Sequence, residues 1–141
     1  MKRNGTAHWT GDLKTGKGDI STESGVLSSV PYSFSKRFET EKGANPEELI
    51  AAAHASCFTM ALSAELAKAG MVAESLRTTC SVTFEKVGEK PTVTASHLDL
   101  VAKIPGASSD AFLNAAHAAE TGCPISRLLN TKITMDAKLE G

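Results

Sequence analysis

The sequence predicts an α+β fold, a single domain over residues 1–141, with an antiparallel sheet and one long helix at its centre. An apolar stretch after Asn45 carries helix signals at both ends, whereas the segments on either side of it alternate with period two. No charged residue occurs between Ile50 and Ala64. A helix that is apolar on all sides must be covered on all sides, and one sheet covers only one. We therefore expect a homodimer.

The central helix is expected to begin at Pro46 and to end shortly before Gly70. Asn45 can cap it, and proline fits the first helical position. Glu47 and Glu48 favour the positive end of the helix dipole. Glycine just past the last turn is a typical helix end.

Three strands are expected before this helix, over Thr6–Trp9, Asp19–Glu23 and Tyr32–Phe38. The third is predicted from aromatic residues at alternate positions, and it carries Arg37 near its end.

Five further elements are expected after the helix. The second of the new strands changes its inward phase, which predicts a bulge near Ser96 or His97. A helix capped by Ser108 or Ser109 runs to Gly122, and a short helix begins with Pro124. The strands are expected over 76–85, 92–104 and 131–140, and the short helix extends to Leu129.

Composition excludes several classes of protein. The hydrophobic fraction is 41%, the charged fraction 22% and the net charge −1, so no basic surface for nucleic acid or membrane is indicated. The long apolar run is expected to be too short and too polar to span a bilayer. No signal peptide is visible at the N-terminus. An odd number of cysteines indicates reduced thiols in the cytoplasm rather than a disulfide framework.

Cys57 is the first candidate for chemistry. A lone cysteine in an alanine-rich helix is more often a small buried hydrophobe. Cys123 changes that balance, because it precedes Pro124 at a cap position where free backbone N–H groups stabilise a thiolate. Cys80 faces inward on a regular strand and is expected to be core. Cys57 lies mid-helix, so the N-terminus of its own helix is not expected to activate it.

Arg37 is the second candidate. Pattern alone favours a solvated charge, but a guanidinium also stabilises a thiolate and negative charge on a departing oxygen. Glu47 can hold such an arginine in a bidentate contact, or simply occupy the first turn of its helix. Glu48 competes with it for either role.

Two histidines and two cysteines also raise the question of a zinc site. His54, Cys57, His117 and Cys123 match no compact zinc-binding spacing, so no metal is expected. His54 is instead expected to be a partly buried neighbour of the Cys57 thiol.

Four blocks of sequence together carry a family resemblance: Arg37-Phe38, residues 41–49 (EKGANPEEL), residues 52–58 (AAHASCF) and residues 122–126 (GCPIS). The chain resembles the family of osmotically inducible protein C and organic hydroperoxide resistance proteins, over essentially its whole length. Ala-His-Ala before Cys57 and the longer N-terminal region are more similar to the osmotically inducible branch.

This resemblance implies a thiol peroxidase that reduces organic hydroperoxides, and hydrogen peroxide less well. It assigns Cys57 as the peroxidatic cysteine, Cys123 as the resolving cysteine, and Arg37 with Glu47 as the activating pair. It implies an intertwined homodimer with long helices inside and sheets wrapped around them. No cofactor is implied; the reductant is an external dithiol, notably a lipoyl group on a protein.

Two other functions stay open at this point. One is a non-enzymatic, stress-induced dimer that binds an apolar small molecule, with its cysteines as bystanders. The other is a disulfide oxidoreductase, which is disfavoured because the sequence has no C-x-x-C motif.

Helix geometry adds an expectation about the activating pair. Ten residues of one helix place Glu47 about 15 Å along the axis from Cys57. We therefore expect Glu47 to serve the Cys57 of a second subunit.

Overall fold

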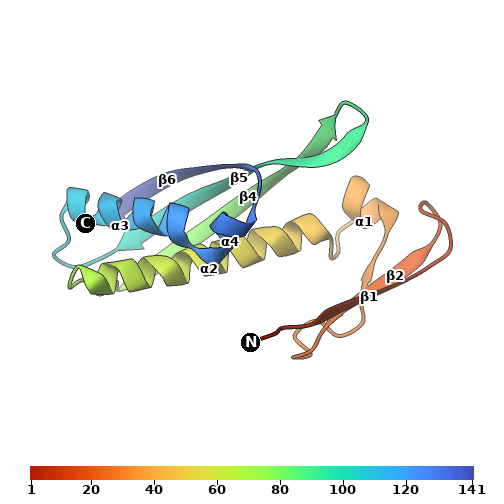
Figure 1. The fold of residues 1–141 in the computed structure, drawn as a ribbon, viewed down its shortest axis with the longest axis horizontal. Coiled ribbons are helices and arrows are strands. Elements are labelled where there is room, and N and C mark those ends of the chain that lie inside the picture. Colours follow the sequence, from red (N-terminus) through yellow and green to blue (C-terminus); the bar gives the residue numbers. More distant parts are fainter. The chain divides into compact units, whose positions relative to one another are not determined.

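The computed structural model describes residues 1–141 as two compact units, Met1–Leu49 and Ile50–Gly141. The first unit is a three-stranded antiparallel sheet, ordered β1-β2-β3, followed by a short helix (Figure 1). Its strands are β1 (Gly5–Thr10), β2 (Lys17–Thr22) and β3 (Val30–Tyr32), and its helix is α1 (Phe34–Phe38). The two strands expected first are thus confirmed.

Trp9 and Tyr32 pack on Gly18 at the centre of this sheet. Their ring centroids are 5.3 Å apart, and a Cβ placed at residue 18 would lie 2.5 Å from the Trp9 ring. Only glycine therefore permits this packing.

The strand predicted over Tyr32–Phe38 is wrong, because its second half is the helix α1. The backbone N–H of Lys36 donates to the Ser33 hydroxyl, which caps the helix. Phe34 and Phe38 then lie one turn apart with ring centroids 4.9 Å apart. Aromatic residues four positions apart fit both a strand and a helix, and the serine cap decides between them. Arg37 therefore projects from a helix.

The long helix α2 (Pro46–Lys68) is confirmed with both of its signals. The Glu48 N–H donates to Asn45 Oδ1 at 2.8 Å, and Gly70 has a φ of 75°. By length and composition alone α2 would be able to cross a membrane, contrary to the expectation from its sequence. It is a core helix instead, because one of its faces is buried. The buried residues of that face recur every four positions: His54, Phe58, Leu62 and Leu66.

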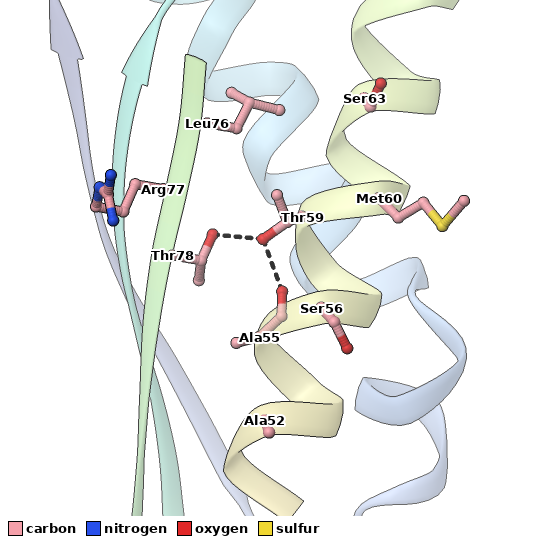
Figure 2. Close-up of a pocket in the computed structure, with 9 residues that line it drawn as sticks. All are labelled: Ala52, Ala55, Ser56, Thr59, Met60, Ser63, Leu76, Arg77 and Thr78. Atoms are coloured by element: carbon pink, nitrogen blue, oxygen red, sulfur yellow. Dashed lines mark hydrogen bonds between the residues drawn. The ribbon is translucent and has the colours of Figure 1, made fainter. Parts of the chain in front are cut away.

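The opposite face of α2 is a stripe of small residues and one methionine, with no charge. Figure 2 shows Met60 pointing away from β4, while the Thr59 hydroxyl donates to that of Thr78 on β4 at 2.7 Å. Met60 is 79% exposed. The exposed stripe, at alternating spacings of three and four, is Ala53, Ser56, Met60, Ser63 and Ala67.

The second sheet is ordered β4-β5-β6, with β4 at Ser75–Val87, β5 at Lys90–Lys103 and β6 at Lys132–Glu140. β4 and β5 pair antiparallel, as predicted, but β5 and β6 pair parallel. The expectation of a purely antiparallel sheet is therefore wrong. The connection through α3 (Ser109–Gly122) and α4 (Pro124–Leu128) returns the chain to the starting end of β5, which is what a parallel pair requires.

The predicted bulge in β5 exists but lies earlier than expected. Thr83 pairs with Ala95 and Phe84 with Val93, so Thr94 is the extra residue. After it, alternate residues from Ser96 onward face the core.

Helices α2 and α3 cover one face of this sheet (Figure 1). The Ser108 hydroxyl caps α3 by accepting from the Ala111 N–H at 3.1 Å, as predicted. The buried core of the unit joins both helices to β5 through Phe58, Leu62, Leu66, Leu98, Leu100, Phe112 and Ala116.

We expect Leu62→Ala to lower the free energy of unfolding by about 2–5 kcal/mol, because the side chain is fully buried and leaves a cavity. Leu128→Ala is the matched control; Leu128 is 72% exposed and its loss should change stability by less than about 0.5 kcal/mol. Urea denaturation measures both. Equal losses in the two variants would contradict this description of the core.

Candidate active site

Cys57 and Cys123 meet at the amino end of α4. Cys123 is the cap residue of that helix, and its sulfur accepts the Ser126 N–H at 3.3 Å. The Ile125 N–H donates to Cys57 Sγ at 3.5 Å. Both sulfurs thus accept backbone N–H groups from the first turn of the same helix. Both thiols are free.

This arrangement adds a hydrogen-bond donor that the sequence did not predict for Cys57. Cys57 lies in the middle of α2, so its own helix offers no free N–H group. The donor comes instead from a second helix, through Ile125. Sequence spacing within α2 could not reveal a contact made by a residue so far along the chain.

Within its unit, the surroundings of Cys57 favour the protonated thiol over the thiolate. Burial raises the pKa of Cys57, the Ile125 N–H lowers it, and the neighbouring Cys123 raises it again. A cysteine that reacts as a thiolate at this position therefore needs a nearby positive charge.

Arg37 and Glu47 form a forked ion pair in the first unit. Arg37 donates to Glu47 Oε1 through Nη2 at 2.9 Å and through Nε at 3.2 Å. The Glu47 side chain is only 10% exposed and that of Arg37 37%. The predicted bidentate contact is thus present, with Glu47 rather than Glu48. An apolar pocket of about 240 Å³ adjoins the arginine, lined by Trp9, Leu13, Tyr32, Ser33, Phe34, Arg37 and Phe38.

The structure therefore brings the four predicted site residues together in pairs. Cys57 lies with Cys123 in one unit, and Arg37 with Glu47 in the other.

His54 is fully buried, not partly buried as expected. Its Nδ1 lies 2.6 Å from Ser96 Oγ, and its Nε2 lies 2.7 Å from Ser126 Oγ. Burial lowers the pKa of His54. Sequence reasoning missed both serines; the only signal was that Ser126 belongs to the GCPIS block.

Cys80 faces inward from β4, as predicted. Its sulfur contacts Ser96 Oγ at 3.2 Å, and burial raises its pKa.

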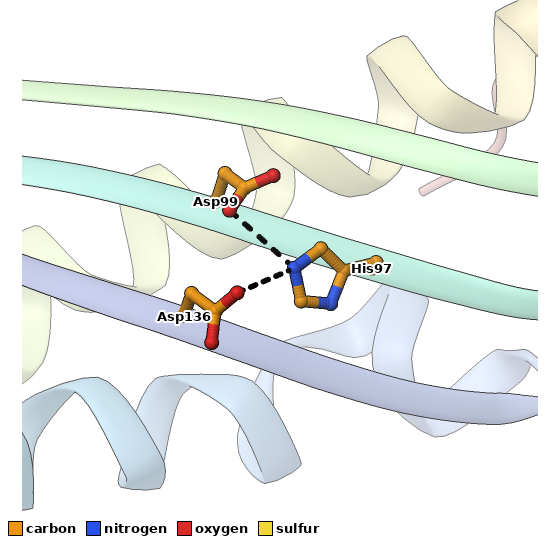
Figure 3. Close-up of side chains that lie close together, drawn as sticks. All are labelled: His97, Asp99 and Asp136. Atoms are coloured by element: carbon orange, nitrogen blue, oxygen red, sulfur yellow. Dashed lines mark hydrogen bonds and ion pairs between the residues drawn. The ribbon is translucent and has the colours of Figure 1, made fainter.

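The two-His, two-Cys set does not assemble into a metal site. Both ring nitrogens of His54 are taken by serines, and His117 lies on the surface, where it contacts Glu120 at 3.2 Å. A different group, His97 with Asp99 and Asp136, gathers on the outer side of the second sheet (Figure 3). His97 Nε2 lies 3.4 Å from Asp99 and 3.2 Å from Asp136, and both carboxylates are exposed. These contacts form a cluster of polar side chains on the surface.

Residues 39–138 match the model of the OsmC-like protein family. The chain is 48% identical over 140 residues to the protein named peroxiredoxin OsmC of Escherichia coli, covering 99% of this chain and 98% of that protein. This chain belongs to the OsmC-like family. The match confirms the expected osmotically inducible branch and a thiol-dependent, cysteine-based peroxidase.

Solved structures share the fold. An OsmC-like protein of unknown function from Vibrio cholerae superposes with a TM-score of 0.76 at 19% identity, covering 97% of this chain and 99% of that one. The organic hydroperoxide resistance protein OhrB of Bacillus subtilis gives 0.67 at 20% identity, covering 97% and 98%.

The buried His54 makes stability depend on pH. The unfolded chain binds a proton as the pH falls below about 6.5, whereas buried His54 with its lowered pKa does not. The unfolded state then binds more protons, so the free energy of unfolding decreases as the pH falls through this range. We expect His54→Gln to lose that part of the dependence between about pH 7.5 and about pH 5.5. Urea denaturation at both pH values measures it; equal pH dependence in wild type and variant would contradict it.

Proposed function

We propose that this peroxidase reduces organic hydroperoxides through a Cys57 sulfenic acid and a Cys57–Cys123 disulfide. The observation that carries the proposal is the meeting of the two sulfurs at the amino end of α4. In the first step the Cys57 thiolate attacks the distal peroxide oxygen. The O–O bond breaks, the sulfur is oxidised to the sulfenic acid, and the alkoxide leaves as an alcohol after taking a proton.

Arg37 is the activating group in this proposal. The pKa of Cys57 is raised by burial, and a guanidinium beside the sulfur favours the thiolate and stabilises the departing oxygen. The forked contact with Glu47 fixes the orientation of the guanidinium.

Cys123 then attacks the oxidised sulfur. An S–S bond forms, the S–O bond breaks, and the thiol proton leaves with the hydroxide as water. A dithiol reductant, of which a protein-bound lipoyl group is an example, restores both thiols by exchange. We place this cycle in the reducing cytoplasm, where free thiols persist.

The apolar pocket beside Arg37 favours a peroxide with a hydrocarbon group. Aromatic rings line it, with Trp9, Tyr32 and Phe34 among them. An alkyl or acyl tail would bury apolar area there that hydrogen peroxide lacks. Organic hydroperoxides are therefore the expected substrates, and hydrogen peroxide a poorer one.

A second copy of the chain is the proposed cover for the exposed stripe of α2. The stripe has no charge over four turns, and its small side chains permit close approach of another helix. The proposed homodimer packs the two α2 helices in antiparallel orientation.

Such a dimer also supplies the activating pair. α2 is one helix from Pro46 to Lys68, so Glu47 and Cys57 of the same chain are separated by about 15 Å along its axis. An antiparallel partner brings the start of one helix beside the middle of the other. Glu47 of one subunit then serves Cys57 of its neighbour.

Peroxide consumption with a dithiol tests the function. We expect Cys57→Ser to abolish turnover of cumene hydroperoxide, while Cys80→Ser retains it, because the strand cysteine has no part in the proposed cycle. Dithiol and monothiol reductants are compared side by side. Equal losses in the two variants, or no turnover by the wild type, would favour a binding protein with bystander cysteines.

Subunit complementation tests the composite site. Mixing inactive Cys57→Ser and Glu47→Ala chains under conditions that exchange subunits should restore about a quarter of wild-type activity, because random pairing makes half of the dimers heterodimers with one intact site each.

The matched control mixes Cys57→Ser with the double variant Cys57→Ser, Glu47→Ala and should stay inactive. Heterodimers proven by mass, without recovered activity and with an inactive Glu47→Ala parent, would mean that the site is built within one chain.

A further inference from the structure

A buried chain of hydrogen-bonding side chains ends at Cys123. Most of its members have no role in the proposed peroxidase cycle. Ser96 on β5, His54 on α2 and Ser126 on α4 follow one another at 2.6 Å and 2.7 Å. Ser126 Oγ then lies 3.1 Å from Cys123 Sγ. His54, Ser96 and Cys123 are 0% exposed and Ser126 is 7% exposed. These contacts are therefore shielded from bulk solvent.

The direction of the hydrogen bonds along this line depends on the state of Cys123. As a thiol, Cys123 donates its S–H to the Ser126 hydroxyl. As a thiolate it has no proton to donate, so Ser126 must donate to it. The Ser126 backbone N–H already donates to the same sulfur at 3.3 Å.

The imidazole of His54 decides whether Ser126 can donate. Burial lowers the pKa of His54, so the ring is neutral and carries one N–H. With that proton on Nε2, the ring donates to Ser126 Oγ and leaves the serine proton for Cys123. In this tautomer Nδ1 accepts from the Ser96 hydroxyl.

We propose that His54 is a positioning residue for the resolving step: through Nε2–H it holds the Ser126 hydroxyl as a hydrogen-bond donor to Cys123. The sulfur of Cys123 is thereby stabilised as the attacking thiolate when the disulfide forms and as the leaving thiolate when a dithiol reduces it. The proposal rests on Cys123 being the resolving cysteine of the proposed function.

The bonds balance without any proton transfer to His54. The Cys123 thiol first gives up its proton; the lone pair of the thiolate then forms the S–S bond, the S–O electron pair leaves with the oxygen as hydroxide, and the released proton combines with that hydroxide as water. His54 stays neutral throughout, as its buried position requires.

Two isosteres of His54 separate this role from packing. Glutamine places its amide near the Nε2 position and keeps a donor for Ser126, whereas asparagine reaches only the Nδ1 position and keeps a partner for Ser96. Both remove the ring. His97→Gln and His97→Asn are matched controls, because His97 lies on the outer side of the sheet and contacts Asp99 and Asp136 instead.

The experiment adds one equivalent of cumene hydroperoxide to the reduced full-length protein and follows two steps. Remaining peroxide reports oxidation of Cys57, and alkylation with mass spectrometry reports the Cys57–Cys123 disulfide. We expect His54→Asn to slow disulfide formation on the order of tenfold, the effect of losing a hydrogen bond to a charged group. His54→Gln should be slowed less, and both should consume the first equivalent of peroxide as fast as wild type.

Ser126→Ala provides a second variant that leaves the ring in place. It should slow disulfide formation at least as much as His54→Asn and allow sulfenic acid on Cys57 to accumulate. Disulfide formation at the wild-type rate in His54→Asn and Ser126→Ala would overturn the proposal. So would equal slowing of disulfide formation in His54→Asn and His54→Gln, if the slowing is proportional to their loss of thermal stability. A wild type that forms no Cys57–Cys123 disulfide would instead overturn the proposed function, and this inference with it.

Discussion

The burial of one face of α2 is the constraint on which the rest of the structure depends. Phe58, Leu62 and Leu66 are each 1% exposed or less and fix the rotation of the helix against the second sheet. That rotation leaves Cys57 at the border between the buried and exposed faces, where it meets the start of α4. The position of the reactive sulfur is therefore a consequence of core packing. The same rotation leaves a small-residue stripe exposed on the other side.

Cys57 is subject to two opposing demands. An apolar setting suits an organic peroxide, but burial raises the thiol pKa and disfavours the reactive thiolate. A backbone N–H from Ile125 offsets this only in part. In the proposed site the remaining stabilisation comes from Arg37, whose guanidinium is held by Glu47. The carboxylate orients the arginine while leaving it partly exposed, so a charge is available at the mouth of an apolar pocket.

Local signals predicted much of the fold. Signals that act over a few residues were confirmed: the Asn45 cap, Pro46 at the helix start, the Ser108 cap and the alternation along β4. The errors arose where distant residues decide. The Tyr32–Phe38 segment has a pattern that fits two structures, and the parallel pairing of β6 depends on the path of the whole connection from β5.

The site shows the same division. The motif blocks indicated Cys57, Cys123, Arg37 and Glu47. The two cysteines lie together at the start of α4, and the arginine and the glutamate form an ion pair. The network around His54 was not predicted, because its partners come from β5 and α4, and nothing in the local pattern marks a buried serine as a hydrogen-bond partner.

The central claim is that Cys57 and Cys123 act as a redox pair. Peptide mapping of the wild-type protein after treatment with one equivalent of an organic hydroperoxide tests it most directly. The account predicts an intramolecular disulfide between these two residues, with Cys80 still a free thiol. A disulfide from Cys57 to Cys80, or one between the Cys57 residues of two chains, would contradict it.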